Sequence, residues 1–391
     1  MLITLSTKYK RGKLMKFVCS KTVLTQIVNI VQKAIGPKSS YPILECIKIE
    51  AQTDGHVSFT ANSIELCIEY TSEITVYESG NIALPSKIFG EIVRKLPEGE
   101  VNITVDPKNY ITDIECGHSK FNIQGMGIEE FPAVPIVDTV YTTSMSQKDL
   151  KNIIKKVIPF VSQMEARKPV LTGALFDFKN NMLNVVGTDS HRLAVIKTPA
   201  GANGESKKFV VPGSTLSKIS QILTDEDEVV KIIVSDKHIL FDFGAYQVYS
   251  RLLEGEFLKY EVILSVTNSI KIKAEKQAII NSFERANLII NDDLSSKTEN
   301  KIPVKMNIAY NKIDISCKTA KGYVNDTVIV DHEGGDIIIG LNCRFMLDAL
   351  NACDEDNVLM EFSAPTSGCF IRPEDGSDRY TYMVLPVRLY N

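Results

Sequence analysis

The residues that come nearest to a catalytic arrangement lie together in one short segment, Thr188-Asp189-Ser190-His191-Arg192. Serine, histidine and a carboxylate are the side chains of a nucleophilic hydrolase. In such enzymes, however, the fold assembles the three from separate parts of the chain, and a G-x-S-x-G turn often exposes the serine. The segment meets neither condition. A hydrolase that uses Asp189, Ser190 and His191 is therefore the weaker hypothesis, and it predicts that Ser190→Ala abolishes turnover.

Two further segments contain residue types that bind metals or nucleotides, but each lacks part of the required pattern. His332-Glu333-Gly334-Gly335-Asp336 begins like a zinc-binding H-E-x-x-H helix, yet it has no second histidine and its glycines disfavour a helix. Gly125-Met126-Gly127 is too short for a dinucleotide-binding loop, and the sequence contains no P-loop. We therefore expect no metal, no cofactor and no catalytic activity.

The eight cysteines are scattered along the chain and form no C-x-x-C pair. Residues 1–14 are basic but lack the apolar core of a signal peptide. This combination is typical of reduced thiols in a cytoplasmic protein rather than of a disulfide or zinc framework. We expect residues 1–14 to form an extension outside the fold, followed by a first strand at Lys16-Phe17-Val18.

The length and charge of the chain limit the classes of protein that fit. A chain of 391 residues exceeds the size at which one hydrophobic core keeps growing, so two to four domains are expected. No apolar run approaches the roughly 20 residues needed to cross a membrane. The net charge of −4 disfavours a protein that binds nucleic acid through an overall basic excess. Any DNA binding therefore depends on where the charges lie.

The strongest pattern is a threefold repeat of a strand, a helix, an acidic turn and another strand. The first strand of this pattern ends near Pro85, Pro212 and Gly340, which lie 127 and 128 residues apart. A second series of helices opens at Ser20, Ser146 and Ala274, with spacings of 126 and 128 residues. The segments Glu130-Phe131-Pro132 and Glu256-Phe257-Leu258 repeat at 126 residues.

Each repeat combines two helices with short alternating strands, which predicts an α+β fold with helices packed on one side of antiparallel sheet. The predicted boundaries give an extension at 1–14 and domains at 15–138, 139–267 and 268–391. The helices that follow Pro85, Pro212 and Gly340 are predicted from apolar stripes at 3.6-residue spacing. The other strands are expected at 43–49, 57–61, 64–70, 175–178, 183–188, 239–243 and 246–252.

Basic residues gather on the helix that opens at Ser146. Lys148, Lys151 and Lys155 are spaced at i, i+3 and i+7, so they share the face opposite the apolar stripe. Acidic residues cluster in turns, as at 225–228. For one helix, a solvated polar face is the simpler interpretation. If the equivalent helices of all repeats share one surface, the lysines instead form a lining that attracts phosphates without reading sequence.

Three segments resemble the beta subunit family of bacterial DNA polymerase III over residues 15–391. Lys16-Phe17 is followed after the first helix by Pro42-Ile43-Leu44. Residues 186–194 read V-G-T-D-S-H-R-L-A, close to the family's A-T-D-(G/S)-H-R-L-A. Residues 382–389 read Y-M-V-L-P-V-R-L, similar to the family's Y-V-V-M-P-M-R-L.

This resemblance implies a DNA-clamp fold of three similar domains, with two protomers closed head to tail into a ring. Helices would line the hole and sheets would form the rim. The implied function is that of a processivity factor without enzymatic activity or cofactor, which encircles double-stranded DNA in the cytoplasm and at the nucleoid. A clamp-like paralogue that serves another replication or resistance factor has the same sequence features.

The resemblance also implies a peptide-binding pocket between the second and third domains. Its partners in the family are polymerase subunits, the clamp loader and repair proteins, which insert a short peptide motif. For His191 and Arg192 the alternative is a structural role that holds the loop by hydrogen bonds. The implied pocket residues are Leu171, Thr188, Ser190, His191, Arg192, Leu193, Leu258, Val262, Ile263, Met383, Val384, Leu385, Pro386, Val387, Arg388 and Leu389.

The chain departs from the family pattern at the pocket. Leu258 replaces the proline of the family's F-P-D-Y, and Val262 stands where some members have arginine. The missing proline is expected to change one wall of the pocket. Residues 390–391 extend beyond the usual terminal leucine.

Two other sets of residues are implied by the resemblance. For the ring interface these are Phe121 on one side and Leu288 with Ile289 on the other, although Leu288 also suits a core position. For DNA contact they are Lys38, Arg167 and Lys168 in loops, together with the helical Lys148, Lys151 and Lys155.

Overall fold

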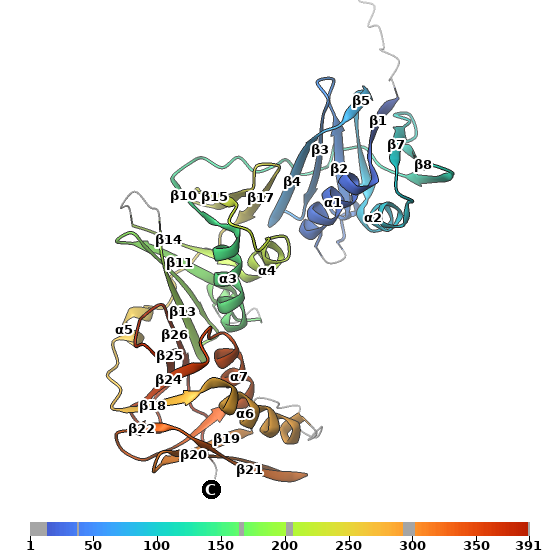
Figure 1. The fold of residues 1–391 in the computed structure, drawn as a ribbon. Coiled ribbons are helices and arrows are strands. Elements are labelled where there is room, and N and C mark those ends of the chain that lie inside the picture. The colour runs from blue at the N-terminus through green and yellow to red at the C-terminus, as the bar shows by residue number, and fades with distance from the viewer. Residues whose placement is uncertain (1–13, 37–38, 164–167, 201–205, 292–301, 390–391) are drawn as a thin grey trace, which may run out of the picture. The chain divides into compact units, whose positions relative to one another are not determined.

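The computed structural model describes residues 14–36, 39–163, 168–200, 206–291 and 302–389 (Figure 1). The chain forms two compact units: unit 1 comprises Met1–Thr142 with Val229–Arg251, and unit 2 comprises Thr143–Glu228 with Leu252–Asn391. Residues 1–13 of the predicted extension lie outside the described residues. The first strand, expected at Lys16-Phe17-Val18, spans Met15–Ser20.

Unit 1 contains a five-stranded sheet of order β5-β1-β7-β8-β9 and most of an eight-stranded sheet of order β10-β15-β16-β17-β4-β3-β2-β6. The strand β10 (Tyr141–Ser146) begins in unit 1 and ends in unit 2. The other elements of unit 1 are β1 (Met15–Ser20), α1 (Lys21–Val31), the 3-10 helices η1 (Gln32–Ala34) and η2 (Pro42–Glu45), β2 (Cys46–Ala51), β3 (His56–Asn62), β4 (Leu66–Glu73), β5 (Thr75–Glu78), β6 (Gly80–Pro85), α2 (Ser86–Lys95), β7 (Glu100–Val105), β8 (Ile111–Cys116), β9 (Ser119–Gln124), β15 (Val229–Val234), β16 (His238–Asp242) and β17 (Tyr246–Arg251).

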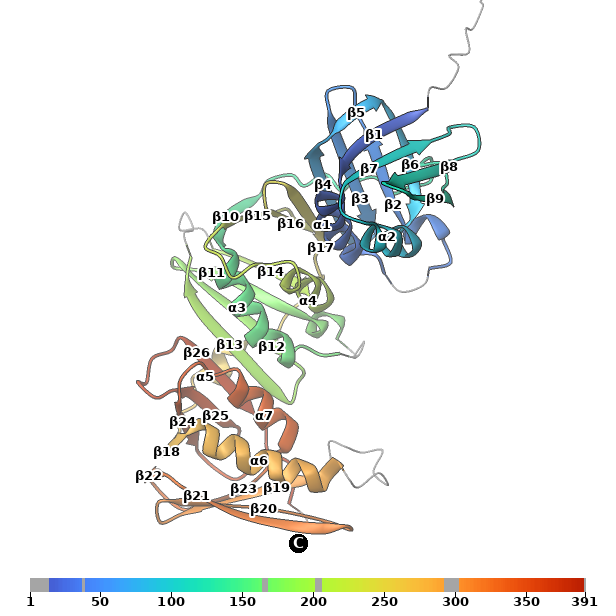
Figure 2. The same ribbon diagram turned by 45° about the vertical axis from the view of Figure 1, so that its right-hand side comes forward.

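Unit 2 contains a nine-stranded sheet of order β14-β11-β12-β13-β26-β25-β24-β18-β22 and a four-stranded sheet of order β21-β20-β19-β23. Its helices α6 and α7 lie side by side (Figure 2). The elements of unit 2 are α3 (Gln147–Val157), η3 (Ile158–Phe160), η4 (Pro169–Thr172), β11 (Gly173–Lys179), β12 (Met182–Thr188), β13 (Arg192–Pro199), β14 (Lys207–Pro212), α4 (Gly213–Ser220), α5 (Tyr260–Leu264), β18 (Ile270–Glu275), α6 (Lys276–Asn291), β19 (Pro303–Ala309), β20 (Lys312–Thr319), β21 (Gly322–Ile329), β22 (Asp331–Glu333), β23 (Ile337–Asn342), α7 (Cys343–Asn351), β24 (Asn357–Phe362), β25 (Cys369–Pro373) and β26 (Tyr380–Val384).

The helices begin where local chemistry favours a start. The Ser20 hydroxyl accepts a hydrogen bond from the Val23 N–H at 3.2 Å at the start of α1, and Ser146 does the same for Asp149 at 3.0 Å at the start of α3. Each cap satisfies an N–H that has no partner within the helix. The apolar stripe of α1 is completely buried, from Leu24 to Val31.

The predicted repeat is confirmed by the order and spacing of the helices. α1, α3 and α6 begin at residues 21, 147 and 276, and α2, α4 and α7 begin at residues 86, 213 and 343. The predicted α+β layering with antiparallel sheet is also confirmed. In Figures 1 and 2, α1 and α2 lie together, as do α6 and α7.

Three local predictions were wrong in detail. Ala274 does not open a helix: it is a buried residue of β18, and α6 begins two residues later. The segment 43–49 starts as the 3-10 helix η2, because Pro42 suits the first turn of a helix and offers no N–H to a sheet. Ile64 has a φ of 74°, which belongs to a turn, so β4 starts at Leu66.

The domain boundaries at 138/139 and 267/268 remain predictions, and the compact units divide the chain elsewhere. Strand β17 pairs with β4 from Tyr246 opposite Tyr70 to Ser250 opposite Leu66. Strands β15 to β17, which belong to the predicted second domain, therefore continue a sheet of the predicted first domain. Within the described ranges, no helix is long and apolar enough to cross a membrane.

All eight cysteines are free and buried, as expected for reduced thiols. Burial raises the pKa of Cys19, Cys67 and Cys353 to about 12. Within the described residues, no three His, Cys, Asp or Glu side chains are grouped closely enough to hold a metal ion.

We predict that none of the eight thiols of the folded protein reacts with 5,5′-dithiobis(2-nitrobenzoate) at pH 8 on a timescale of minutes. The thiolate is the reactive form, and burial both blocks the reagent and keeps the thiol protonated. Absorbance of the released thionitrobenzoate measures the reaction, and in guanidinium chloride all eight should react. Rapid modification of any thiol in the folded protein would contradict this packing.

Candidate peptide-binding site

Unit 2 contains a cavity of about 640 Å³ whose lining is mainly apolar. Its floor belongs to a hydrophobic cluster that includes Leu171 of η4, Phe370 of β25 and Met383 of β26. α5 and the residues on either side of it form one wall. The lining residues are Lys168, Leu171, Thr188, Ser190, Arg192, Glu256, Phe257, Leu258, Val262, Ile263, Val266, Ser367, Gly368, Phe370, Met383 and Leu385.

The β12–β13 turn, which supplies the polar part of the lining, is held by its own side chains. The Thr188 hydroxyl donates to the carbonyl of Arg192 at 2.7 Å and accepts from the Ser190 N–H at 3.2 Å. One carboxylate oxygen of Asp189 accepts from the backbone N–H groups of His191 and Arg192 at 2.9 and 3.1 Å. Ser190 has a φ of 74°. These bonds keep Ser190 in a backbone conformation that non-glycine residues seldom adopt.

Arg192 is 7% exposed, and its guanidinium donates to three separate elements of unit 2. Nε binds Asp189 Oδ2 at 2.9 Å, Nη1 binds Asp348 Oδ2 at 2.5 Å, and Nη2 binds the Pro159 carbonyl at 2.5 Å. Asp348 lies on α7 and Pro159 in η3. Arg192 thus joins the turn to two helices. This is the contact expected if Arg192 has a structural role and does not only bind a peptide.

Aromatic rings enclose the same guanidinium. The Arg192 Cζ atom lies 4.2 Å from the ring centroid of Phe345 and 5.3 Å from that of Phe160. The His191 ring stacks on Phe345 at 6.4 Å between centroids, and His191 does not line the cavity. A cation between aromatic faces is stabilised by their quadrupoles, more so when it is desolvated.

This geometry does not support the hydrolase hypothesis. The Asp189 carboxylate is engaged by Arg192 and by backbone N–H groups, and the His191 ring faces Phe345. A catalytic triad requires the carboxylate to orient the histidine and the histidine to bind the serine hydroxyl. The segment 188–192 instead forms a rigid turn that places Ser190 at the edge of an apolar cavity.

Nine of the sixteen predicted pocket residues line the cavity, and seven do not. Leu193 of β13 is buried in the cluster that forms the floor, and Val384 of β26 is also buried. After Leu385 the chain turns away, because the Val387 N–H donates to the Gly340 carbonyl of β23 at 2.8 Å. The residues outside the lining are His191, Leu193, Val384, Pro386, Val387, Arg388 and Leu389; those that line it are Leu171, Thr188, Ser190, Arg192, Leu258, Val262, Ile263, Met383 and Leu385.

Seven lining residues are not among those predicted from the sequence. Lys168 had been assigned to DNA contact, and Phe257 belongs to a segment that marked the repeat but had no role assigned. Gly368 allows close packing, since a Cβ there would lie 2.7 Å from the Met383 sulfur. The missed residues are Lys168, Glu256, Phe257, Val266, Ser367, Gly368 and Phe370.

The two departures from the family pattern lie at the exposed side of this cavity. Leu258 is 42% exposed and Val262 is 67% exposed. Both extend an apolar surface from the floor toward solvent, while Lys168 and Glu256 supply charges in the lining. A cleft of this kind accommodates apolar side chains of an extended peptide, with a few polar groups to fix its direction.

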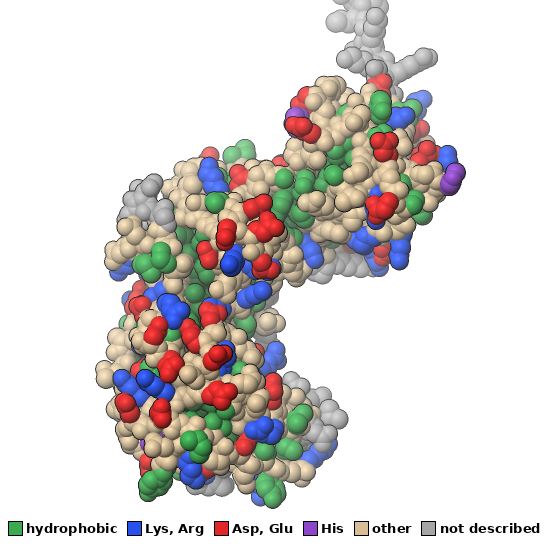
Figure 3. All heavy atoms as spheres, in the orientation of Figure 1, with side chains coloured by type: hydrophobic (Ala, Val, Ile, Leu, Met, Phe, Trp, Pro, Cys, Tyr) green, Lys and Arg blue, Asp and Glu red, His purple; other side chains and the backbone are tan. Residues whose placement is uncertain are grey.

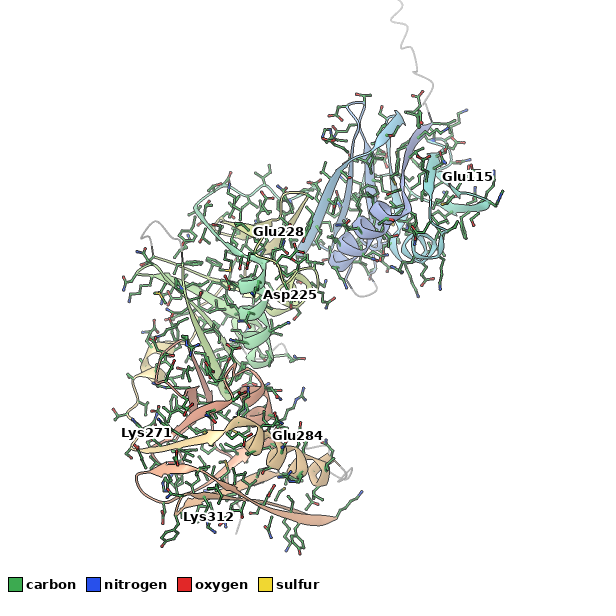
Figure 4. All side chains as sticks on the ribbon, in the orientation of Figure 1. Glu115, Asp225, Glu228, Lys271, Glu284 and Lys312 are labelled. Carbon is green, nitrogen blue, oxygen red and sulfur yellow. The ribbon has the colours of Figure 1, made fainter. Side chains whose placement is uncertain are left out.

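The lysines of α3 differ in their availability for phosphates. Lys148 and Lys155 are exposed, whereas Lys151 Nζ lies 3.0 Å from Asp225 Oδ1. The hydrogen bond from Lys151 lowers the pKa of Asp225. Asp225 lies beside α3 in Figure 4, and in Figure 3 acidic and basic side chains are interspersed over the visible face of unit 2. Lys38 and Arg167 lie outside the described residues.

Two of the three predicted interface residues, Phe121 and Leu288, are exposed. Phe121 is 39% exposed on β9, the outer strand of the five-stranded sheet. Leu288 is 70% exposed on α6, so it is not a core residue of unit 2. Ile289 is partly buried, and its Cδ1 atom lies near Gly322 at the start of β21.

Comparison with known proteins gives one consistent result. Family models of the DNA polymerase III beta subunit match its N-terminal domain at 15–135, its central domain at 144–259 and its C-terminal domain at 263–388. The beta sliding clamp of Staphylococcus epidermidis is 32% identical over 387 residues, covering 96% of this chain and 100% of the relative.

Solved structures agree with the sequence comparison. A Eubacterium rectale protein assigned as a DNA polymerase III beta subunit matches with a TM-score of 0.90 at 37% identity, covering 96% of this chain and 100% of that one. The Bacillus subtilis DNA polymerase sliding clamp matches with a TM-score of 0.90 at 30% identity, covering 97% and 100%. The fold is therefore that of a DNA clamp. The chain belongs to the family of DNA polymerase III beta subunits, the bacterial sliding clamps, which confirms the resemblance seen in the sequence.

We predict that Arg192→Ala lowers the free energy of unfolding of unit 2 by about 3 kcal/mol, because it leaves Asp189 and Asp348 without their buried partner. Urea denaturation followed by circular dichroism measures the change.

Arg379→Ala is the matched control. That arginine is 55% exposed in its ion pairs with Glu355 and Asp375, so its removal should cost no more than about 1 kcal/mol. Equal losses for the two variants would contradict the structural role of Arg192.

Proposed function

We propose that two copies of this chain close head to tail into a ring that encircles double-stranded DNA and tethers proteins to it through the cavity of unit 2. As a beta sliding clamp, the chain is a processivity factor of DNA replication and not an enzyme. The proposed partners are replicative polymerase subunits, the clamp loader and repair proteins, and the proposed location is the cytoplasm and nucleoid. The three proposed domains of each copy span 15–138, 139–267 and 268–391.

Two open sheet edges support ring closure. β9 of unit 1 and β21 of unit 2 are outer strands of their sheets. β9 exposes Phe121, and β21 exposes Tyr323 and Ile329, which are 72% and 76% exposed. Long exposed edges with apolar side chains are open to pairing with another chain. If β9 of one copy meets β21 of another, the contact joins unlike surfaces, so a closed ring needs two such contacts.

Exposed lysines support contact with the phosphate backbone. Lys148 and Lys155 share one face of α3 and are proposed to contact DNA, as are Lys38 and Arg167, which lie outside the described residues. Lys168 lines the peptide cavity instead. Contacts to phosphates carry no sequence information, so they permit sliding.

The observation that carries the tethering proposal is the apolar cavity between η4, α5 and the β13–β26 pair. It is large enough for several side chains of a short peptide. Its floor is apolar, and its charged lining residues are Lys168, Arg192 and Glu256. A short motif at a chain terminus or in a loop can enter it while the rest of the partner remains free.

We predict that Leu385→Asp weakens peptide binding at least about tenfold, because a carboxylate at the cavity must be desolvated against apolar side chains. Leu385 is 38% exposed, so the fold should tolerate the change. Fluorescence anisotropy with a labelled peptide copied from the clamp-binding segment of the host polymerase measures the Kd. Ile136→Asp, at an 86% exposed position outside the cavity lining, should leave the Kd unchanged. Equal Kd values for Leu385→Asp and wild type would rule out this cavity as the binding site.

We predict that Phe121→Asp converts the dimer into a monomer, because it places a charge on an apolar edge that the ring buries. Multi-angle light scattering should give twice 43.5 kDa for wild type and 43.5 kDa for the variant. Ile136→Asp serves again as the control and should remain dimeric. A dimeric Phe121→Asp variant would place the interface elsewhere.

A further inference from the structure

A buried carboxylate connects α5 to the sheet beneath it. Asp177 on β11 is 1% exposed. Its Oδ2 atom accepts a hydrogen bond from the Tyr260 hydroxyl at 2.7 Å and lies 2.9 Å from Lys208 Nζ. Burial of a charge is unfavourable unless hydrogen bonds and an opposite charge compensate, so these partners hold one another strongly.

Tyr260 is also the first residue of α5, the wall of the cavity. Its side chain is 3% exposed and packs in the same cluster as Leu171 and Met383 of the cavity floor. Val262 and Ile263, two and three residues later, line the cavity. A helix of five residues has no stability of its own, so the position of α5 depends on its contacts.

Lys208 strengthens the same attachment from the neighbouring strand β14. Besides Asp177, its Nζ atom lies 3.3 Å from Glu261 Oε1 in α5. The hydrogen bond to Asp177 raises the pKa of Lys208, and burial raises the pKa of Tyr260. Both side chains therefore keep their protons at neutral pH and continue to donate to the carboxylate.

The segment that leads into α5 lacks a restraint that the first repeat of this chain has. Glu130-Phe131-Pro132 contains a proline where Glu256-Phe257-Leu258 has leucine. Proline fixes one backbone angle and narrows the conformations open to a segment. Because Leu258 does not restrict the backbone in this way, the position of α5 depends more on side-chain contacts.

We propose that the Asp177–Tyr260–Lys208 cluster is the anchor that holds α5 in the peptide-binding position, with Tyr260 as a positioning residue for partner capture. This inference rests on the proposed function of the cavity. When the anchor is weakened, α5 spends less time in place, and the apparent affinity falls in proportion to the fraction of competent molecules. Tyr260 donates to Asp177 on the sheet and is not among the residues that line the cavity, so its effect on a peptide acts through Val262 and Ile263.

Tyr260→Phe tests the anchor while keeping the aromatic ring in the cluster. We expect about tenfold weaker binding of the labelled polymerase peptide, expressed mainly as slower association, since fewer molecules are competent at any moment. Hydrogen exchange should become faster at the N–H groups of Val262, Ser265 and Val266, which are bonded within α5 and its end. Lys208→Met, at a half-exposed side chain that the fold can lose, should shift both readouts in the same direction by about threefold.

Tyr249→Phe is the matched control, since it removes a tyrosine hydroxyl that donates to Gln247 in unit 1. It should leave both the peptide affinity and the exchange of α5 unchanged. Unchanged peptide association in Tyr260→Phe, or unchanged exchange of α5, would overturn the anchor. If wild-type protein fails to bind the peptide, the proposed function of the cavity is wrong, whereas the exchange measurement still reports whether the anchor holds α5.

Discussion

The pairing of β13 with β26 is the interaction on which the site depends. It runs from Arg192 opposite Val384 to Ile196 opposite Tyr380 and joins strands almost 200 residues apart into one sheet. The register places the β12–β13 turn next to Met383 and Leu385. The polar edge of the cavity therefore lies directly beside its apolar floor. Arg192 ends the pairing, and its buried guanidinium ties the turn to α7 and η3. A shift of one residue would exchange the two faces of the strand and remove the floor.

Equivalent segments of the repeat pack differently in the two units. The segment around Phe131 in unit 1 is part of a filled core, whereas the segment around Phe257 in unit 2 borders the cavity. In unit 1, Phe131 is 9% exposed and packs with Ile43 and Ala83. Residues just before it are fixed by backbone bonds between Met126 and Ala83. In unit 2 the equivalent Phe257 is only partly buried at the edge of its cluster, and α5 follows it at the cavity wall. Small changes in one connecting segment thus separate a filled core from a binding site.

Local signals in the sequence predicted most of the fold. Serine caps predicted the starts of α1 and α3 to within a residue, because a cap is a property of neighbouring residues. The apolar stripe predicts a first helix through Ile35, whereas α1 ends at Val31 and a 3-10 helix follows it. Ala274 does not begin a helix, because it continues the buried face of β18 after Ile270 and Ile272. The motifs at 188–193 and 382–389 predicted two sides of the cavity. Ser367 to Phe370 and the partner of Arg192 on α7 were missed, because strand pairing and a contact across 156 residues leave no pattern in the sequence.

Retention on DNA of different topology shows whether the protein encircles DNA. The protein would be loaded by the host clamp loader onto a nicked circular plasmid, and half of the sample would then be linearised at a single site. We expect the ring to stay on the circle in high salt and to slide off the linear ends, because a closed ring needs no ionic contact to remain linked. Equal retention on circular and linear DNA would contradict it and leave a clamp fold that binds DNA only by charge.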